Sequence, residues 1–198
     1  YFEIYTTTDG GDNWIRTPQA NIATQLAGEF GITSVYTAHG DSTVWFGTNL
    51  GPIYKTTDRG LNWTAVSTPY TGSYIGDIAF KDALNGIATN GSPATALSDI
   101  IRTTDGGATW SLVATNTANI LTKVLSYVPG TASTYFLSSP QAGGGTAFTL
   151  DDGDTWVSAD NLIHSDIEFT AAEIGWTGSN ELNAPMFRWN GPVAANCA

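Results

Sequence analysis

The chain contains little cysteine and little positive charge. Its 198 residues include one cysteine, Cys197, so no internal disulfide and no cysteine-rich metal site can form. Seven residues are lysine or arginine and 18 are aspartate or glutamate, which gives a formal net charge of −11. A chain this acidic has no basic patch for nucleic acid or for an anionic membrane surface, and we expect neither partner.

Long apolar runs and helical periodicity are also missing. No run approaches the roughly 18 apolar residues of a membrane span, so no membrane insertion is expected. The only candidate helix covers residues 22–28 and is short. The chain begins at Tyr1 without a methionine or a signal-peptide pattern, and we expect a processed or excerpted product. Because 41% of the residues are hydrophobic and 12% aromatic, a folded core is expected and intrinsic disorder is not.

One octapeptide pattern, T-x-D-x-G-x-x-W, occurs four times at nearly constant spacing. Its aspartates are separated by 49, 47 and 46 positions, which indicates a repeat architecture. The sixteen residues that define the pattern are Thr7, Asp9, Gly11, Trp14, Thr56, Asp58, Gly60, Trp63, Thr103, Asp105, Gly107, Trp110, Thr149, Asp151, Gly153 and Trp156.

Each residue type of the octapeptide suits a tight β-hairpin turn. Aspartate can accept backbone N–H groups inside a loop, and glycine adopts the positive φ that other residues resist. Threonine favours the incoming strand, while tryptophan can bury a large surface beside the turn. We therefore interpret all sixteen residues as structural. Residues 151–154 contain three aspartates but lack the spaced ligands of a calcium loop, so no metal is expected.

Between the octapeptides, short β-type runs alternate with Gly, Asn, Asp and Pro. The repeat units cover residues 1–17 (partial), 34–68, 74–115, 121–159 and 164–191 (partial) of a single module, residues 1–198. Four antiparallel strands per unit predict an all-β fold, a β-propeller of four to five four-stranded blades. The expected 17 strands leave two arrangements open: a four-bladed ring closed by the termini, and an arc of a larger ring with further blades.

The octapeptide resembles the Asp-box, also called the bacterial neuraminidase repeat. That motif marks propellers of sialidases, xyloglucanase-type glycoside hydrolases, sortilin-type receptors and photosystem-II assembly-factor-like proteins. The runs at 77–80 and 166–169 are similar to the inner strands of assembly-factor-like blades. The Thr-, Gly- and Asn-rich, lysine-poor repeats resemble those of secreted or surface proteins of Bacteroidota-like bacteria. The resemblance implies a secreted or cell-surface location, with the boxes on outer hairpins far from the ligand face.

Two kinds of glycosidase chemistry can be compared with the sequence. Sialidase chemistry needs three arginines that bind the sugar carboxylate, together with an Arg-Ile-Pro signature. This sequence has no such signature, and three of its four arginines lie in or beside octapeptides, so sialidase chemistry is excluded. Other glycoside hydrolases need two facing carboxyl groups, and Asp77 and Asp166 are the one symmetric carboxylate pair on predicted inner strands. We expect both to cap the entry to their strands and to lie far apart around the ring. Part of a xyloglucanase-like glycoside hydrolase therefore remains the alternative function.

The sequence thus predicts a non-catalytic scaffold with no cofactor. Its partner would be a protein or a glycan, bound at the channel mouth or at loops between blades. Tyr70 and Tyr74 lie in one such loop and are the candidates for an exposed contact. An assembly chaperone like the photosystem relatives would need an arginine-rich face, for which seven basic residues leave little material.

Four further side chains have expected positions. Trp45 and Trp176 fall on predicted second strands, where we expect them to pack between blades, with sugar stacking as the alternative. His39 and His164 have no second ligand at metal-binding spacing and are expected in solvated loops.

Overall fold

The computed structural model of the chain describes residues 2–91, 100–113, 124–140, 144–179 and 186–189. These residues form 17 β-strands and one 3-10 helix, η1 (Gln19–Asn21). The predicted all-β class is confirmed. The candidate helix over 22–28 is wrong, because Ile22 instead forms a parallel bridge to Trp63 and the residues after it have no regular secondary structure or form a turn.

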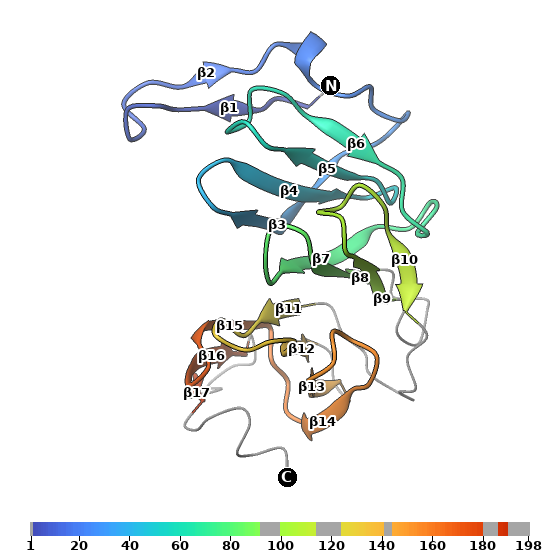
Figure 1. The fold of residues 1–198 in the computed structure, drawn as a ribbon, viewed down its shortest axis with the longest axis vertical. Helices are drawn as coiled ribbons and strands as arrows, with labels where there is room; N and C mark the ends of the chain where they lie inside the picture. The colour runs from blue at the N-terminus through green and yellow to red at the C-terminus, as the bar shows by residue number, and fades with distance from the viewer. Residues whose placement is uncertain (1, 92–99, 114–123, 141–143, 180–185, 190–198) are drawn as a thin grey trace.

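Three antiparallel four-stranded sheets follow one another along the chain (Figure 1). We call each sheet a blade. Blade 1 contains β3 (Gly31–His39), β4 (Thr43–Thr48), β5 (Ile53–Thr56) and β6 (Thr64–Val66). Blade 2 contains β7 (Ile75–Phe80), β8 (Gly86–Asn90), β9 (Ile100–Thr103) and β10 (Ser111–Val113). Blade 3 contains β11 (Val124–Tyr127), β12 (Tyr135–Ser139), β13 (Gly145–Thr149) and β14 (Val157–Asp160).

Two smaller sheets flank these blades. The N-terminal hairpin consists of β1 (Tyr5–Thr6) and β2 (Ile15–Arg16), and blade 4 consists of β15 (Asp166–Ala171), β16 (Ile174–Gly178) and β17 (Phe187–Arg188). Figure 1 shows the hairpin at the top of the molecule and blade 4 in the lower half, beside blade 3. The ends of the predicted repeat units at 114–115, 121–123 and 190–191 lie outside the described residues.

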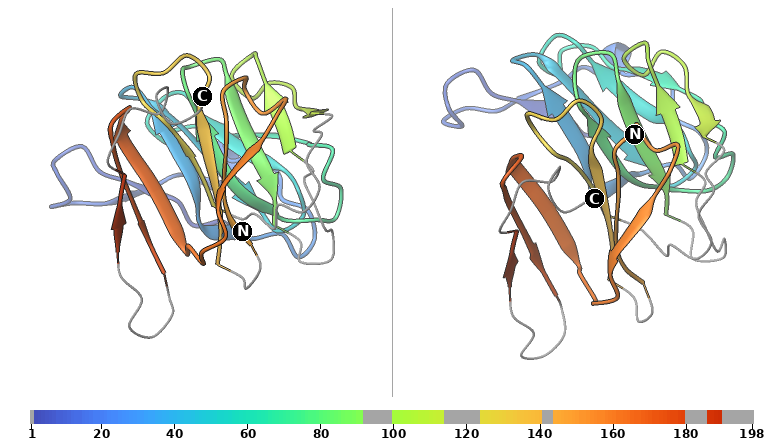
Figure 2. Two further views of the ribbon diagram at one scale, coloured as in Figure 1. Left: turned by 90° about the horizontal axis from the view of Figure 1, so that it is seen from below. Right: turned by 60° about the horizontal axis from the view of Figure 1, so that its bottom comes forward.

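The first strands of the four blades lie side by side along the inner edge of the assembly. β3 contacts β7, β7 contacts β11 and β11 contacts β15. The remaining strands of each blade follow outward in chain order, so the last strand is the outermost. Figure 2 shows the blades fanning out from this inner edge.

The hydrophobic core is divided into layers between successive blades. The layer between blades 1 and 2 includes Trp45, Phe80 and Ile101, and the layer between blades 2 and 3 includes Ile100 and Leu137. Ile100 and Ile101 are neighbours on β9 and enter different layers because side chains of a strand alternate between its faces. Each complete blade is therefore buried on both faces.

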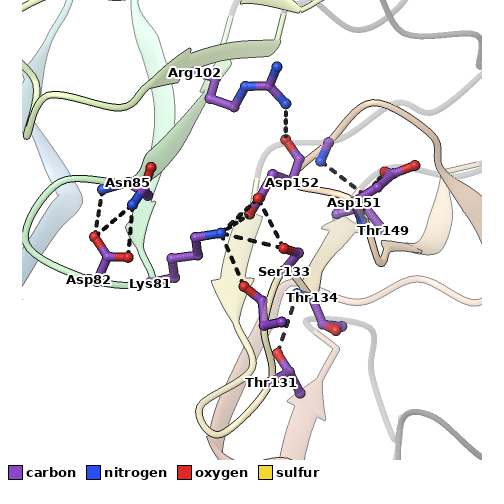
Figure 3. A network of polar contacts seen from close by, with 12 residues as sticks. Lys81, Asp82, Asn85, Arg102, Thr131, Ser133, Thr134, Thr149, Asp151 and Asp152 are labelled. Carbon is purple, nitrogen blue, oxygen red and sulfur yellow. Dashed lines mark hydrogen bonds and ion pairs between the residues drawn. The ribbon is translucent and has the colours of Figure 1, made fainter.

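Polar contacts cross the interface between blades 2 and 3 as well (Figure 3). The Nζ of Lys81 lies 2.7 Å from the carboxylate of Asp152 and donates to Ala132 O at 3.0 Å. Asp152 also accepts from Ser133 Oγ at 3.0 Å. No helix among the described residues has the length and apolar character needed to cross a bilayer.

Candidate functional site

The octapeptides of blades 1 to 3 form the turns between the third and fourth strands at the outer edge, and the first octapeptide joins β1 to β2 of the N-terminal hairpin. We call all four the octapeptide turns. In the turn of blade 2, Thr103 Oγ1 donates to Asp105 Oδ1 at 2.8 Å and accepts from the Gly107 N–H at 2.8 Å. Asp105 in turn accepts the backbone N–H and the hydroxyl of Thr109 at 2.9 and 2.6 Å. The same contacts recur in the other three turns, with asparagine replacing Thr109 in two of them.

These hydrogen bonds engage the turn carboxylates and keep them ionised. The side chain and backbone N–H of Asn13 lower the pKa of Asp9 to about 2, and the equivalent donors of Thr109 lower the pKa of Asp105 to about 2. The pKa of Asp58 is lowered by Asn62 in the same way. The glycine of the T-x-D-x-G-x-x-W pattern has positive φ in all four turns, from 84° to 102°. The four aspartates are dispersed over four outer hairpins and do not form a shared pocket.

One turn differs from the others in the exposure of its tryptophan. Trp63, Trp110 and Trp156 are buried, with 6–8% of their surface exposed. Trp14 is 61% exposed, so the expectation that every octapeptide tryptophan is buried is wrong for the first turn. The sequence pattern cannot show this difference, because the covering side chains come from another part of the chain.

The inner strands enclose a polar groove of about 630 Å³, which we call the central groove. It is lined by β3, β7, β11 and β15, and its polar side chains include Tyr36, Asp77, Ser126, Asp166 and Glu168. Among the described residues, no lysine or arginine lines it. The groove is therefore an acidic surface at the inner edge of the fold.

Asp77 holds two inner strands together at the floor of the central groove. Its Oδ1 accepts the N–H of Ile78 on its own strand, and its Oδ2 accepts the N–H of Leu125 on β11, both at 2.8 Å. Burial raises the pKa of Asp77 to about 7, and the charges of Asp166 and Glu168 add to the increase, while both N–H groups oppose it. Asp77 thus has a structural role and is also close to half-protonated near neutral pH.

Asp166 holds the equivalent position on β15, and its Oδ1 accepts the N–H of Ile167 at 3.0 Å. Two residues later, burial and the charge of Asp166 raise the pKa of Glu168, which Ser126 partly offsets. The expectation that Asp77 and Asp166 lie far apart is wrong, since both line the same groove and interact electrostatically. The strongly curved arrangement of four inner strands brings them together.

Tyr70 and Tyr74 do not form the exposed pair expected from the sequence. Tyr70 is 3% exposed and lies in the layer between blades 1 and 2, where its hydroxyl donates to Ala88 O at 3.4 Å. Tyr74 is partly buried and packs against the backbone of Gly91. The loop is folded back onto the blades, so the two rings support blade packing.

The expected positions of the histidines and inter-blade tryptophans are only partly observed. His164 is 1% exposed and not solvated, and its Nε2 lies 3.2 Å from both carboxylate oxygens of Asp160. Trp45 is fully buried and stacks on Phe80 of blade 2 with 3.8 Å between ring centroids, as expected for packing between blades. Trp176, at the equivalent position of blade 4, is 40% exposed.

No group of three His, Cys, Asp or Glu side chains within the described residues could hold a metal ion. The sequence reasoning found Asp77 and Asp166 but missed Glu168, Tyr36 and Ser126 as groove residues. The alternation of side chains along a strand could have predicted Glu168, because Glu168 lies two residues after Asp166 and therefore on the same face of β15.

Known proteins with similar sequence or structure were compared with this geometry. No family model matches the chain. The photosystem II assembly lipoprotein Ycf48 of Synechococcus sp. (strain CC9902) is 40% identical over 67 residues, which is 34% of this chain and 18% of that protein. YCF48 from Cyanidioschyzon merolae superimposes with a TM-score of 0.61 at 18% identity, covering 95% of this chain and 63% of that one. The chain has the β-propeller fold.

Glycoside hydrolases share this propeller fold. An ancestral GH74 enzyme gives a TM-score of 0.59 at 15% identity, covering 81% of this chain and 23% of that one. GH74 from Niastella koreensis gives 0.59 at 16% identity, covering 87% and 31%. This chain spans less than two thirds of the length of each of these relatives. Since the same fold occurs in enzymes and in an assembly factor, function has to be argued from the groove.

Proposed function

We propose that the protein is a non-catalytic, secreted or cell-surface propeller that binds a protein partner through the central groove. The partner would present a segment rich in lysine or arginine. The observation that carries the proposal is the concentration of carboxylates in the groove, where Asp77, Asp166 and Glu168 lie without a described cationic neighbour.

Electrostatic repulsion within the groove supplies a physical reason for binding cations. The charge of Asp166 raises the pKa of both Asp77 and Glu168, so ionising all three carboxyl groups is unfavourable. A lysine or arginine placed among them would relieve the repulsion and lower the raised pKa values of Asp77 and Glu168. Tyr36, which is 65% exposed at the groove, adds an aromatic surface over which a cation can pack.

A labelled tetralysine peptide tests this proposal by fluorescence anisotropy. We expect the dissociation constant to rise with salt, and to rise about tenfold in the Asp166→Asn/Glu168→Gln double variant, as is usual for the loss of two charge contacts. The Asp41→Asn/Glu173→Gln variant loses the same charge at exposed turns outside the groove. Equal weakening by both double variants would show that the peptide senses only net charge and would contradict the proposal.

Glycan binding or hydrolysis is the second candidate, and one observation favours it. A carboxyl group with a pKa of about 7 that shares a groove with further carboxyl groups resembles the acid–base pair of glycosidases. Both oxygens of Asp77 are engaged by backbone N–H groups, however, which leaves it poorly placed to protonate a substrate. Hydrolysis of xyloglucan by the wild type that disappears in Asp166→Asn would establish this function in place of the first.

The proposed secreted or cell-surface location is supported by the composition of the repeats, which are rich in Thr, Gly and Asn and poor in lysine and resemble those of secreted or surface proteins. Protease treatment of intact cells tests it. Degradation of the protein without cell lysis would support an exposed location, and protection until lysis would contradict it.

A further inference from the structure

In each blade, three side chains at equivalent positions lie in a row on the same face of the sheet, and in blades 1 to 3 this face packs against the next blade. The row contains one residue from each of the first, second and third strands, and each residue is the cross-strand partner of the next. We call this row the forward row. The four forward rows are Thr37–Trp45–Lys55, Ala79–Ile87–Arg102, Ser126–Phe136–Phe148 and Glu168–Trp176–Arg188.

The forward row of blade 1 shows how a tryptophan at the middle position docks. Trp45 is fully buried against blade 2, where it stacks on Phe80. Its indole Nε1 donates to the carbonyl of Gly106 at 3.0 Å, and Gly106 belongs to the octapeptide turn of blade 2. Lys55 lies over the Trp45 ring at 5.3 Å. A side chain on the second strand of blade 1 therefore binds the octapeptide turn of blade 2 directly.

The forward row of blade 2 shows how an arginine at the third position docks. Nη1 of Arg102 lies 2.9 Å from Asp154 Oδ1. It also donates to the Asp152 carbonyl at 3.1 Å (Figure 3). Both acceptors belong to the octapeptide turn of blade 3. Even the N-terminal hairpin follows this rule, because Thr6, at the equivalent third-strand position, donates from Oγ1 to the Arg59 carbonyl at 3.1 Å.

Blade 4 combines both docking residues in one row, and within the described residues no blade covers them. Trp176 pairs with Arg188 in the register that joins Trp45 to Lys55 and Ile87 to Arg102. Trp176 is 40% exposed, whereas Trp45 is fully buried, and Arg188 is exposed. Glu168 completes an exposed polar and aromatic surface.

The first octapeptide turn has the complementary features. Its Trp14 is 61% exposed, although the tryptophans of the other turns are buried. Asp12 occupies the position of Asp154, which accepts from an arginine, and Gly10 occupies the position of Gly106, which accepts from a tryptophan. This turn therefore carries both acceptors that the forward row of blade 4 would need.

We propose that the forward row of blade 4 binds the first octapeptide turn of a second copy of this chain. Arg188 would pair with Asp12, and the Trp176 indole would donate to the Gly10 carbonyl, as Arg102 and Trp45 do within the chain. Figure 1 shows blades 1 and 2 between the N-terminal hairpin and blade 4 along the long axis, so the hairpin and blade 4 are apart within one molecule, and we place the contact between two copies. The contact is head-to-tail, and it generates a closed ring or an open chain of copies.

Sedimentation velocity over a range of concentrations, at low salt, tests the contact. We expect concentration-dependent association that weakens about tenfold or more in Trp176→Ala, since truncating a central aromatic residue commonly costs this much affinity. Because Trp176 is exposed, the variant should fold, which its circular dichroism spectrum checks. A chain that stays monomeric at the highest concentration would overturn the proposal, and the forward row of blade 4 would then bind something other than a second copy.

A charge exchange gives the decisive second measurement. Arg188→Asp and Asp12→Arg should each weaken association, and mixing the two variants should restore it. Asp41→Arg, an equal charge change at an exposed turn outside both surfaces, should have little effect. Association that is insensitive to Arg188→Asp and Asp12→Arg would overturn the proposal, because the contact would then involve other surfaces.

Discussion

Asp77→Asn should remove most of the pH dependence of stability between pH 5 and 8. Burial raises the pKa of Asp77 to about 7 from an ordinary value of 3.8. The native state therefore binds this proton more tightly than the unfolded chain. The resulting stabilisation is complete below the unfolded pKa and is lost as the pH rises through about 7. A tenfold change in proton affinity corresponds to about 1.4 kcal/mol, so the full effect is about 4 kcal/mol, of which about 2–3 kcal/mol falls between pH 5 and 8.

Urea unfolding followed by tryptophan fluorescence at pH 5, 6, 7 and 8 measures this effect. We expect the free energy of unfolding of the wild type to fall across the range and that of Asp77→Asn to change little. At pH 5 the variant should be less stable by about 1–3 kcal/mol, because an amide cannot accept both N–H groups that Asp77 accepts. The turn aspartates do not interfere, since the pKa values of Asp9 and Asp105 are about 2.

Asp166→Asn provides the internal control. It keeps both hydrogen bonds of Asp77 and removes a charge that raises the pKa of Asp77, so the loss of stability should shift to lower pH and become smaller. A wild type whose stability is flat or increases between pH 5 and 8 would refute the reasoning. So would an Asp77→Asn variant that loses as much stability as the wild type.

Three further predictions concern blade packing and the octapeptide turns, each measured by urea unfolding at pH 7. Trp45→Ala should cost about 3–5 kcal/mol, whereas Trp176→Ala at the equivalent, exposed position should cost less than about 1 kcal/mol; similar losses would contradict the packing described for Trp45. Thr103→Val removes the three hydrogen bonds of the Thr103 hydroxyl within a turn and should cost about 2 kcal/mol, while Thr8→Val in an exposed turn position should be nearly neutral. Lys81→Met breaks a largely buried ion pair between blades and should cost about 1–3 kcal/mol, and an unchanged midpoint would show that the pair contributes nothing.

The repeat predicts the fold well because it encodes local structure. Each octapeptide contains its own threonine, aspartate and glycine, and their contacts span at most four residues, so the turn forms wherever the pattern occurs. The alternation of side chains along each strand then gives every blade two faces to bury. These features are sufficient to predict an all-β propeller of antiparallel blades from the sequence.

The errors arise where a residue depends on segments distant in sequence. Trp14 has the same local pattern as Trp156, but their exposure differs because neighbouring segments cover one and not the other. Tyr70 was expected at the surface because it lies in a loop between blades, yet the loop folds back and buries the ring. The proximity of Asp77 and Asp166 depends on how four inner strands curve, which no local pattern reports.

The claim that the central groove is the binding surface is tested most directly by locating where a cationic peptide contacts the protein. In a nuclear magnetic resonance titration of the ¹⁵N-labelled protein with tetralysine, we expect the largest amide shifts in β7, β11 and β15 around the groove carboxylates. The amides of the octapeptide turns should move little. Shifts concentrated in those turns, or spread evenly over the acidic surface, would contradict the account.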